Sequence, residues 1–188
     1  SPVKFGFFLF SKLPSAYFSG VRVKEFSYEK SVVTVPYKWF SQNPFKSLYF
    51  ACQAMAAEMS TGLLALLHVH GRKPAVSMLV IKIEGEFLKK GVSVVSFVCK
   101  DGEAMESAIE EAIVSGNSVQ FTAKSIGTNE KGEVVTEAGL TKPAPFSVIV
   151  TVVALVNVLP LTVTGAVPQV LPLLLLNVMA GPLAQPHD

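Results

Sequence analysis

A single acidic side chain, Glu58, stands in a long apolar stretch, and its type and position make it the first candidate for chemistry. The stretch covers residues 43–67 and reads NPFKSLYFACQAMAAEMSTGLLALL. If it forms a helix, the side of the helix that carries Glu58 also carries Ala51, Ala54, Met55, Thr61 and Gly62. Another backbone or a ligand can therefore come close to this carboxyl group. A carboxylate in such a place needs polar partners, a shifted pKa or a functional role.

Other residue types that often carry chemistry form weaker patterns. His68 and His70 lack a third ligand nearby, and the helix dipole already favours a histidine at a helix end, so we expect no metal. The motifs of nucleophile elbows, P-loops and dinucleotide-binding turns are absent. Cys52 and Cys99 have no cysteine-rich surroundings, so we expect two buried, reduced thiols in a cytoplasmic protein.

The stretch that carries Glu58 predicts a helix that other structure must wrap. A surface helix would show one polar face, whereas this one is apolar on nearly every side. Ser47 is the predicted N-cap, and Gly71 with Pro74 gives the stop signal. We therefore expect a long helix at the centre of the fold.

The rest of the chain predicts mainly strands. Two further helices are expected, an aromatic one at 5–13 that Pro14 ends and an amphipathic one at 103–115. The partial alternation of 76–87 and 92–100 predicts strands that are covered on both faces. The expected strands are 21–28, 31–37, 76–87, 92–100, 119–126 and one that begins at 134–137. This order predicts an α+β protein with the hotdog fold, an antiparallel sheet wrapped around one long central helix.

Length and charge limit the classes of partner. The chain has 188 residues, which suits one domain. Its formal net charge is +2, and the basic residues are scattered with no run longer than Lys89–Lys90. We therefore expect no nucleic-acid partner.

Several separated blocks resemble a known family. NPFKSLYFACQAMAAEMSTGLL, SMLVIKIEGEFLKK, GEAMESAIEEAI and GTNEKGEVVTE are similar to an uncharacterised branch of hotdog proteins related to PaaI-type acyl-CoA thioesterases. The resemblance runs from Leu13 to Glu137 and implies a hotdog domain over residues 1–137. It also implies acyl-thioester substrates, and a homodimer or dimer of dimers with its sites at the subunit interface.

The resemblance also implies roles for individual residues. Asn43 takes the place of the family's asparagine, which holds the thioester or the loop, and Glu58 takes the place of its catalytic acid, as general base or nucleophile. The family's His-Gly-Gly falls on Tyr49, Phe50 and Ala51, and there the match fails. The backbone N–H of Phe50 remains as the oxyanion donor, while the side chains of Phe50 and Ala51 narrow the approach to it.

Two hydroxyl groups complete the expected site, and two interpretations of the protein's function remain open. Ser60 and Thr61 could position the attacking water or bind substrate, although such residues often only bond their own helix backbone. Hydrolysis needs water and charge stabilisation, so no cofactor is expected beside acyl-CoA as substrate. The alternative is a non-catalytic acyl-binding or structural hotdog dimer.

The last part of the chain, residues 138–188, departs from the family pattern. From Pro143 to His187 it carries no Asp, Glu, Lys or Arg, and Pro160, Pro168 and Pro172 divide it into pieces too short for a membrane-spanning helix. Three interpretations remain open. The tail is an aberrant end, or a membrane-associating extension, or its segment 146–156 replaces the missing last strand.

Overall fold

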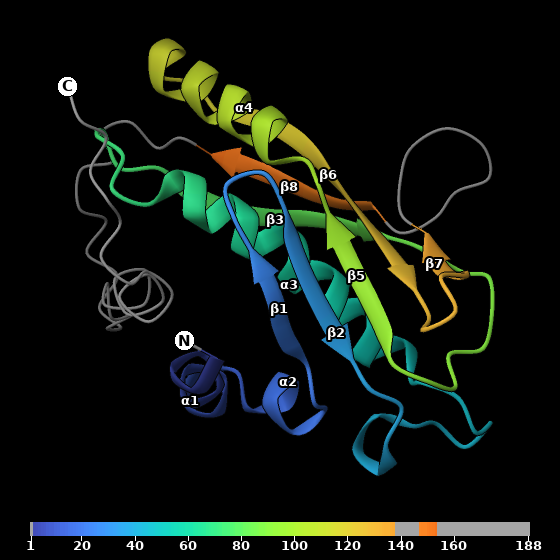
Figure 1. Cartoon of the computed structure of the whole chain (residues 1–188). Coiled ribbons are helices and arrows are strands. Elements are labelled where there is room, and N and C mark those ends of the chain that lie inside the picture. Colours follow the sequence, from blue (N-terminus) through green and yellow to red (C-terminus); the bar gives the residue numbers. More distant parts are fainter. Residues whose placement is uncertain (1, 138–146, 154–188) are drawn as a thin grey trace.

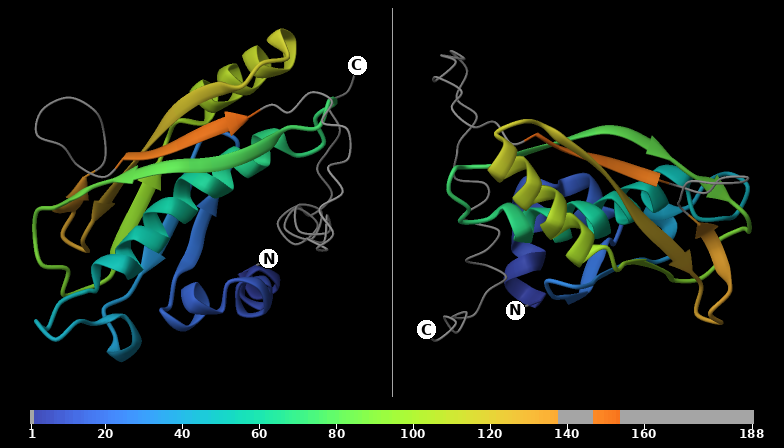
Figure 2. Two further views of the ribbon diagram at one scale, coloured as in Figure 1. Left: turned by 180° about the vertical axis from the view of Figure 1, so that it is seen from behind. Right: turned by 90° about the horizontal axis from the view of Figure 1, so that it is seen from above.

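One long helix lies at the centre of the fold and a sheet curls around it (Figure 1). The computed structural model describes residues 2–137 and 147–153. Helix α3 (Phe50–Val69) packs against β2, β5, β6 and β8, and seen from behind it lies along one face of the sheet (Figure 2). Within the described residues it is the one helix long and apolar enough to cross a membrane, and its burial against the sheet accounts for that apolar composition.

The sheet is antiparallel throughout. Strands β1, β2, β5 and β6 are neighbours in that order, and β6 then pairs with β8 along its first half and with β7 near its end. Strand β3 pairs with β8 and β4 pairs with β7. The strands are β1 (Arg22–Phe26), β2 (Ser31–Val35), β3 (Ser77–Glu84), β4 (Glu86–Phe87), β5 (Val95–Cys99), β6 (Val119–Thr128), β7 (Val134–Glu137) and β8 (Ser147–Val153). A single antiparallel sheet around one helix confirms the predicted α+β hotdog fold.

The core forms where the inner face of the sheet meets α3. The sheet contributes Val33, Val35, Val95 and Phe97, all fully buried, and the helix contributes mainly small residues such as Ala56. Small helix residues let the strands approach closely, which a large side chain on every turn would prevent. Gly127 on β6 serves the same end, because a Cβ atom there would lie 2.7 Å from the ring of Phe97.

Three further helices and one 3₁₀ turn flank this core. Helix α4 (Gly102–Ser115) confirms the predicted amphipathic helix and ends at Gly116, whose φ of +67° suits glycine. Helix α1 (Pro2–Lys12) confirms the predicted aromatic helix, and α2 (Pro14–Phe18) follows it at once. The proline expected only to break a helix therefore also starts one, as its fixed φ allows. The 3₁₀ turn η1 (Trp39–Ser41) leads toward α3.

Two local predictions were wrong. The N-cap of α3 is Tyr49, because Ser47 belongs to a turn around Asn43 and donates its hydroxyl to the Asn43 side chain. Strand β3 is mostly exposed, although the sequence pattern predicted cover on both faces. The reason is its place in the sheet: β8 pairs along one side of β3, and no described strand pairs along the other.

Strand β8 lies inside the segment 146–156, where one of the three interpretations of the tail expects a closing strand. Glu84 pairs with Ser147, and two positions later Glu86 pairs with Glu137. β8 and β7 therefore lie against one continuous stretch of β3 and β4. The other expectations for the tail concern residues 138–146 and 154–188, which lie outside the described part of the chain.

Candidate functional site

The first part of the candidate site is a cavity of about 410 Å³ at the start of α3, called here the helix-start cavity. The loop before the helix and the turn after β4 close it, held together by a hydrogen bond of 2.7 Å from the Leu48 N–H to the Gly91 carbonyl. Its lining is Asn43, Ser47, Leu48, Phe50, Gln53, Phe87, Leu88, Lys89, Lys90 and Gly91. The loop and turn therefore bring polar and basic side chains to the positive end of the helix dipole.

Asn43 holds the loop that enters α3. Its side-chain oxygen accepts hydrogen bonds from the Phe45 N–H at 3.0 Å, the Ser47 N–H at 3.2 Å and the Ser47 hydroxyl at 3.1 Å. Its backbone adds bonds to Ser47 and Lys46. The amide oxygen thus has a structural task, and only the side-chain NH₂ group is left to orient a ligand.

Phe50 is the first residue of α3, and N–H groups in the first turn of a helix have no partner within it. Such a group can stabilise a developing oxyanion. Aromatic rings stand beside it: the ring of Phe50 lies 4.9 Å from that of Tyr49 and 6.1 Å from that of Phe87. Ala51 follows in the same turn and is partly buried. Three aromatic rings therefore lie together at the start of α3.

Sequence reasoning missed Gln53, the one buried amide side chain of α3. Its oxygen accepts a hydrogen bond of 2.7 Å from the Thr136 hydroxyl on β7, and its NH₂ group donates to the Leu48 carbonyl at 3.3 Å. It therefore ties the helix to the sheet at the floor of the cavity. The available signal was its type, a neutral polar residue among apolar neighbours.

The basic residues of the cavity come from the turn after β4. Lys89 forms an ion pair with Glu133 at 2.8 Å, and the Lys90 ammonium group lies 3.5 Å from the Phe45 carbonyl. Lys89 and Asn129 hold the pKa of Glu133 below its usual range. Because the Glu133 carboxylate stays ionised, it offsets part of the positive charge that Lys89 brings to the cavity.

The second part of the candidate site is an apolar groove of about 250 Å³ between α3, β3 and the end of α1, called here the Glu58 groove. Glu58 is the one charged residue in its lining. The other lining residues are Leu13, Met59, Gly62, Leu63, Leu66, Met78 and Val80. The carboxyl group leans over Gly62, where an added Cβ atom would lie 3.0 Å from Oε1.

These surroundings change the acidity of Glu58. Burial raises the pKa of this carboxyl group above its usual range. Among the described residues, no hydrogen bond or ion pair reaches its oxygens to favour the charged form. A carboxyl with a raised pKa, next to space for a ligand, is suited to general acid–base chemistry.

The two hydroxyls after Glu58 are used within the fold. Ser60 is fully buried, donates to the Ala57 carbonyl at 2.7 Å and shares a hydrogen bond of 2.7 Å with Ser125 on β6. Thr61 is also fully buried and donates to the Glu58 carbonyl at 2.9 Å. Both therefore follow the alternative expected for them, a hydrogen bond to their own helix backbone.

The structure thus divides the predicted residues between two places. Asn43 and Phe50 line the helix-start cavity, whereas Glu58 lies in the groove. Glu58 lies eight positions after Phe50 in the helix, which corresponds to about 12 Å along the axis. Within one chain the proposed oxyanion donor and the acid therefore do not converge on one reacting atom.

The remaining candidates have structural contacts. His68 is buried, and its Nε2 lies 2.8 Å from the Tyr28 carbonyl. Cys52 and Cys99 are free and buried, as predicted, and burial raises the pKa of the Cys99 thiol to about 12. A thiol of that acidity stays protonated at neutral pH and is a poor nucleophile.

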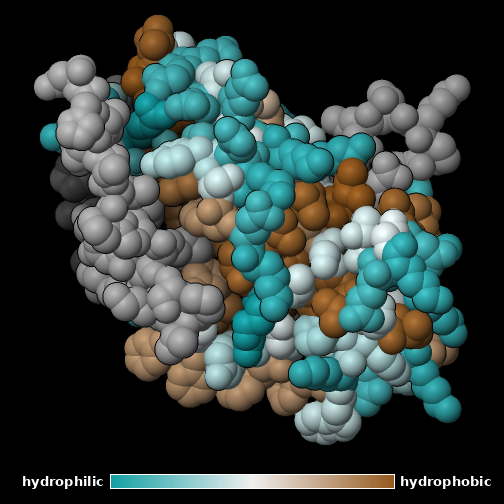
Figure 3. Space-filling model, in the orientation of Figure 1, coloured by the Kyte–Doolittle hydropathy of each residue, from teal (hydrophilic) through white to brown (hydrophobic). Residues whose placement is uncertain are grey.

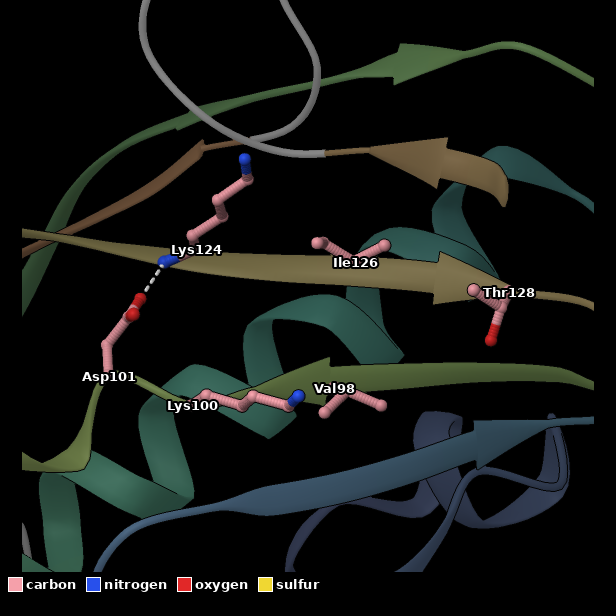
Figure 4. Close-up of a pocket in the computed structure, with 6 residues that line it drawn as sticks. All are labelled: Val98, Lys100, Asp101, Lys124, Ile126 and Thr128. Atoms are coloured by element: carbon pink, nitrogen blue, oxygen red, sulfur yellow. Dashed lines mark hydrogen bonds between the residues drawn. The ribbon is translucent and has the colours of Figure 1, made fainter. Parts of the chain in front are cut away.

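A third hollow, of about 280 Å³, lies on the outer face of the sheet between β5 and β6 (Figure 4). Lys100 and Lys124 border it, and Val98 and Ile126 form its apolar part. The Asp101 carboxylate accepts a hydrogen bond of 2.5 Å from the Lys124 backbone N–H, so it joins β6 to the start of α4. None of the predicted site residues lines this hollow.

Comparison with known proteins supports the fold. No protein-family model and no curated protein matches the chain. The structure is similar to a probable thioesterase, PA5026 from Pseudomonas aeruginosa, with a TM-score of 0.65 and 17% identity over 82% of this chain and 97% of that one. It is also similar to OLEI01261 from Chlorobaculum tepidum, a protein of unknown function, with a TM-score of 0.65 and 13% identity over 81% and 94% of the two chains. Thioesterase HI1161 from Haemophilus influenzae matches with a TM-score of 0.57 and 12% identity over 84% and 93%.

At these identities the likeness establishes the hotdog fold and leaves the activity open. The three proteins are nearly covered by this chain, so the similarity concerns whole folds. Two of the three are named as thioesterases, one of them a probable one.

Proposed function

We propose that the protein hydrolyses acyl thioesters, with Glu58 as the general base for water or as the nucleophile. The observation that carries this proposal is the Glu58 groove, where one carboxyl group lies among apolar side chains. The apolar lining suits an acyl chain, and burial raises the pKa of Glu58, which makes its carboxylate a stronger base. Acyl-CoA is the proposed substrate, and the reaction requires no cofactor.

A second copy of the chain would complete the site. Strand β3 has no described partner along its outer side, so it forms an unprotected edge of the sheet. It also exposes the side chains of Leu79, Ile81 and Ile83. Antiparallel addition of a second β3 would place both α3 helices on the same face of one longer sheet. The Asn43 side chain and Phe50 N–H of one copy could then serve the Glu58 of the other, across the interface.

The test of hydrolysis is free-thiol release from short, long and aromatic acyl-CoA substrates. Glu58→Gln keeps the shape of the side chain but cannot accept a proton, so turnover should fall by about 10²- to 10⁴-fold. Glu111→Gln, a change of an exposed glutamate on α4, is the matched control and should keep wild-type turnover. Equal turnover in wild type and Glu58→Gln would remove Glu58 from the mechanism.

The test of the interface is the mass in solution. A lysine on an edge strand opposes pairing with another strand, so Ile81→Lys should shift the mass from twice 20.2 kDa to 20.2 kDa and lower turnover. Val114→Lys places the same charge on α4, at a side chain that is 85% exposed, and should change neither. Light scattering after gel filtration measures the mass. A wild-type monomer with full turnover would contradict the shared site.

One observation favours an alternative, an acyl-binding dimer without turnover. The rings of Tyr49, Phe50 and Phe87 crowd the start of α3, where an oxyanion would have to approach. Saturable binding of acyl-CoA, measured by calorimetry, together with no thiol release on any substrate would support this binding function.

A further inference from the structure

One end of the molecule exposes aromatic side chains from the helices α1 and α2 and from the 3₁₀ turn η1. Their exposed fractions lie between 44% and 80%, well above what a packed core leaves open. We call this surface the aromatic end; it consists of Phe7, Phe10, Phe18, Trp39 and Phe40, together with Leu13 between α1 and α2. Figure 1 places α1 and α2 at the lower edge, and Figure 3 shows brown side chains along that edge. An exposed apolar surface of this kind marks a contact site.

Most of these rings form one ordered surface. The rings of Phe10 and Phe18 lie 6.1 Å apart, those of Phe18 and Phe40 are stacked at 5.7 Å, and those of Phe40 and Trp39 lie 5.5 Å apart. The chain of contacts runs from α1 through α2 to η1. Because the rings contact one another within the chain, the surface is already formed in the absence of a partner.

The part of the chain that carries these rings has a positive net charge. Residues 1–57 contain seven Lys or Arg and two Glu, so they carry +5, while the rest of the chain carries −3. Lys12 and Lys38 are exposed, and each is next in sequence to a residue of the aromatic end. The two acids, Glu25 and Glu29, belong to the end of β1 and the turn after it, and β1 runs away from α2 (Figure 1). Glu25 is also paired with Lys30 at 2.8 Å.

We propose that the aromatic end docks onto a lipid bilayer with anionic headgroups. Tryptophan and phenylalanine rings insert at the boundary between headgroups and acyl chains, and nearby lysines attract anionic lipids. The central parts of protein interfaces are depleted in lysine, so exposed lysines beside the rings fit a bilayer better than a protein partner. Docking does not depend on hydrolysis. Leu13 also lines the Glu58 groove, so the bilayer would border that groove.

Trp39 provides the probe, because it is the only tryptophan of the chain and is 80% exposed. The full chain is mixed with vesicles of equal parts phosphatidylserine and phosphatidylcholine, and with vesicles of phosphatidylcholine alone. The anionic vesicles should shift Trp39 emission to the blue, brominated acyl chains should quench it, and added salt should weaken binding. Equal binding to neutral vesicles, or no blue shift, would overturn the proposal.

Variants that retain Trp39 as the probe test whether the aromatic end, rather than another part of the chain, binds the vesicles. Phe7→Ser with Phe10→Ser should weaken partitioning at least about tenfold, because two large apolar side chains no longer insert. Lys12→Gln and Lys38→Gln should each weaken it about fivefold. The matched controls, Val114→Ser and Lys131→Gln, change exposed residues outside the aromatic end and should bind as wild type does.

Two outcomes would give the aromatic end another role or place lipid binding in another part of the chain. Unchanged vesicle binding in the Phe7→Ser/Phe10→Ser variant would place lipid binding in another segment, such as residues 138–188. A change of mass in that variant without vesicles, measured by light scattering, would make the aromatic end a contact between copies of the chain. Either result overturns the proposal, and circular dichroism confirms that each variant is folded.

Discussion

The helix-start cavity and the Glu58 groove differ in how their polar groups are satisfied. In the cavity, the side-chain oxygens of Asn43 and Gln53 accept hydrogen bonds from within the fold. In the groove, the Glu58 carboxyl lies among apolar side chains and has no such bond among the described residues. A buried polar group that makes its hydrogen bonds stabilises a fold. A buried carboxyl group without hydrogen bonds has a charged form of higher free energy. The polar side chains of the cavity therefore stabilise the fold, whereas the Glu58 carboxyl is the group that we propose as base or nucleophile.

The largest effect on stability should come from the cavity. Asn43→Ala removes three hydrogen bonds from the entry loop and should lower the free energy of unfolding by about 1–3 kcal/mol. Asn43→Asp keeps the oxygen acceptor, so its stability in urea should stay near that of wild type. It lacks the NH₂ donor, and turnover should therefore fall if that donor orients the thioester. Full turnover in Asn43→Asp would limit Asn43 to the loop.

In the groove, a substitution should have the opposite effect on stability. Replacing the Glu58 carboxylate by a neutral group should increase the free energy of unfolding. Since burial raises the pKa of Glu58, the folded state favours the protonated form, and that preference is lost as pH rises through the raised pKa. Glu58→Gln should therefore be more stable than wild type above the raised pKa. The difference should shrink below pH 4.5, the ordinary value for a glutamate. Thermal unfolding across this pH range measures it, and a Glu58→Gln variant that is less stable at high pH would contradict the assignment.

A smaller effect would sharpen the comparison within the groove itself. Gly62→Ala improves the intrinsic helix propensity by up to about 1 kcal/mol. Its new Cβ atom would lie 3.0 Å from Oε1 of Glu58, so the flexible carboxyl must move. We expect unchanged or slightly higher stability together with reduced turnover. A variant with wild-type turnover would mean that the observed position of the carboxyl is not the reactive one.

Local patterns predicted most of the elements because they depend on neighbours in sequence. The apolar run around Glu58 predicted α3, and the stripe before Gly116 predicted α4 within one residue of its start. The start of α3 differed because Asn43 closes a turn with Ser47, and such a turn competes with helix capping. A serine ahead of an apolar run fits either arrangement equally well.

The exposure of β3 and the task of Gln53 could not be predicted in the same way. Residues 76–87 read as a covered strand, yet β3 lies at an edge because of which strands pair with which. Gln53 bonds with Thr136, which lies 83 positions away. Pairings of this kind depend on the closure of long loops and leave no periodic signal in either segment.

By itself, the sequence determined that a lone carboxyl would lie on an apolar helix and that a sheet would have to cover that helix. The reason is solvation, because the burial of so many apolar residues is favourable and the helix that contains them also contains Glu58. Only the tertiary structure decided that Glu58 faces a groove about 12 Å along the helix from the Phe50 N–H. Only the strand order left β3 open to a second copy, because an edge is a property of the assembled sheet.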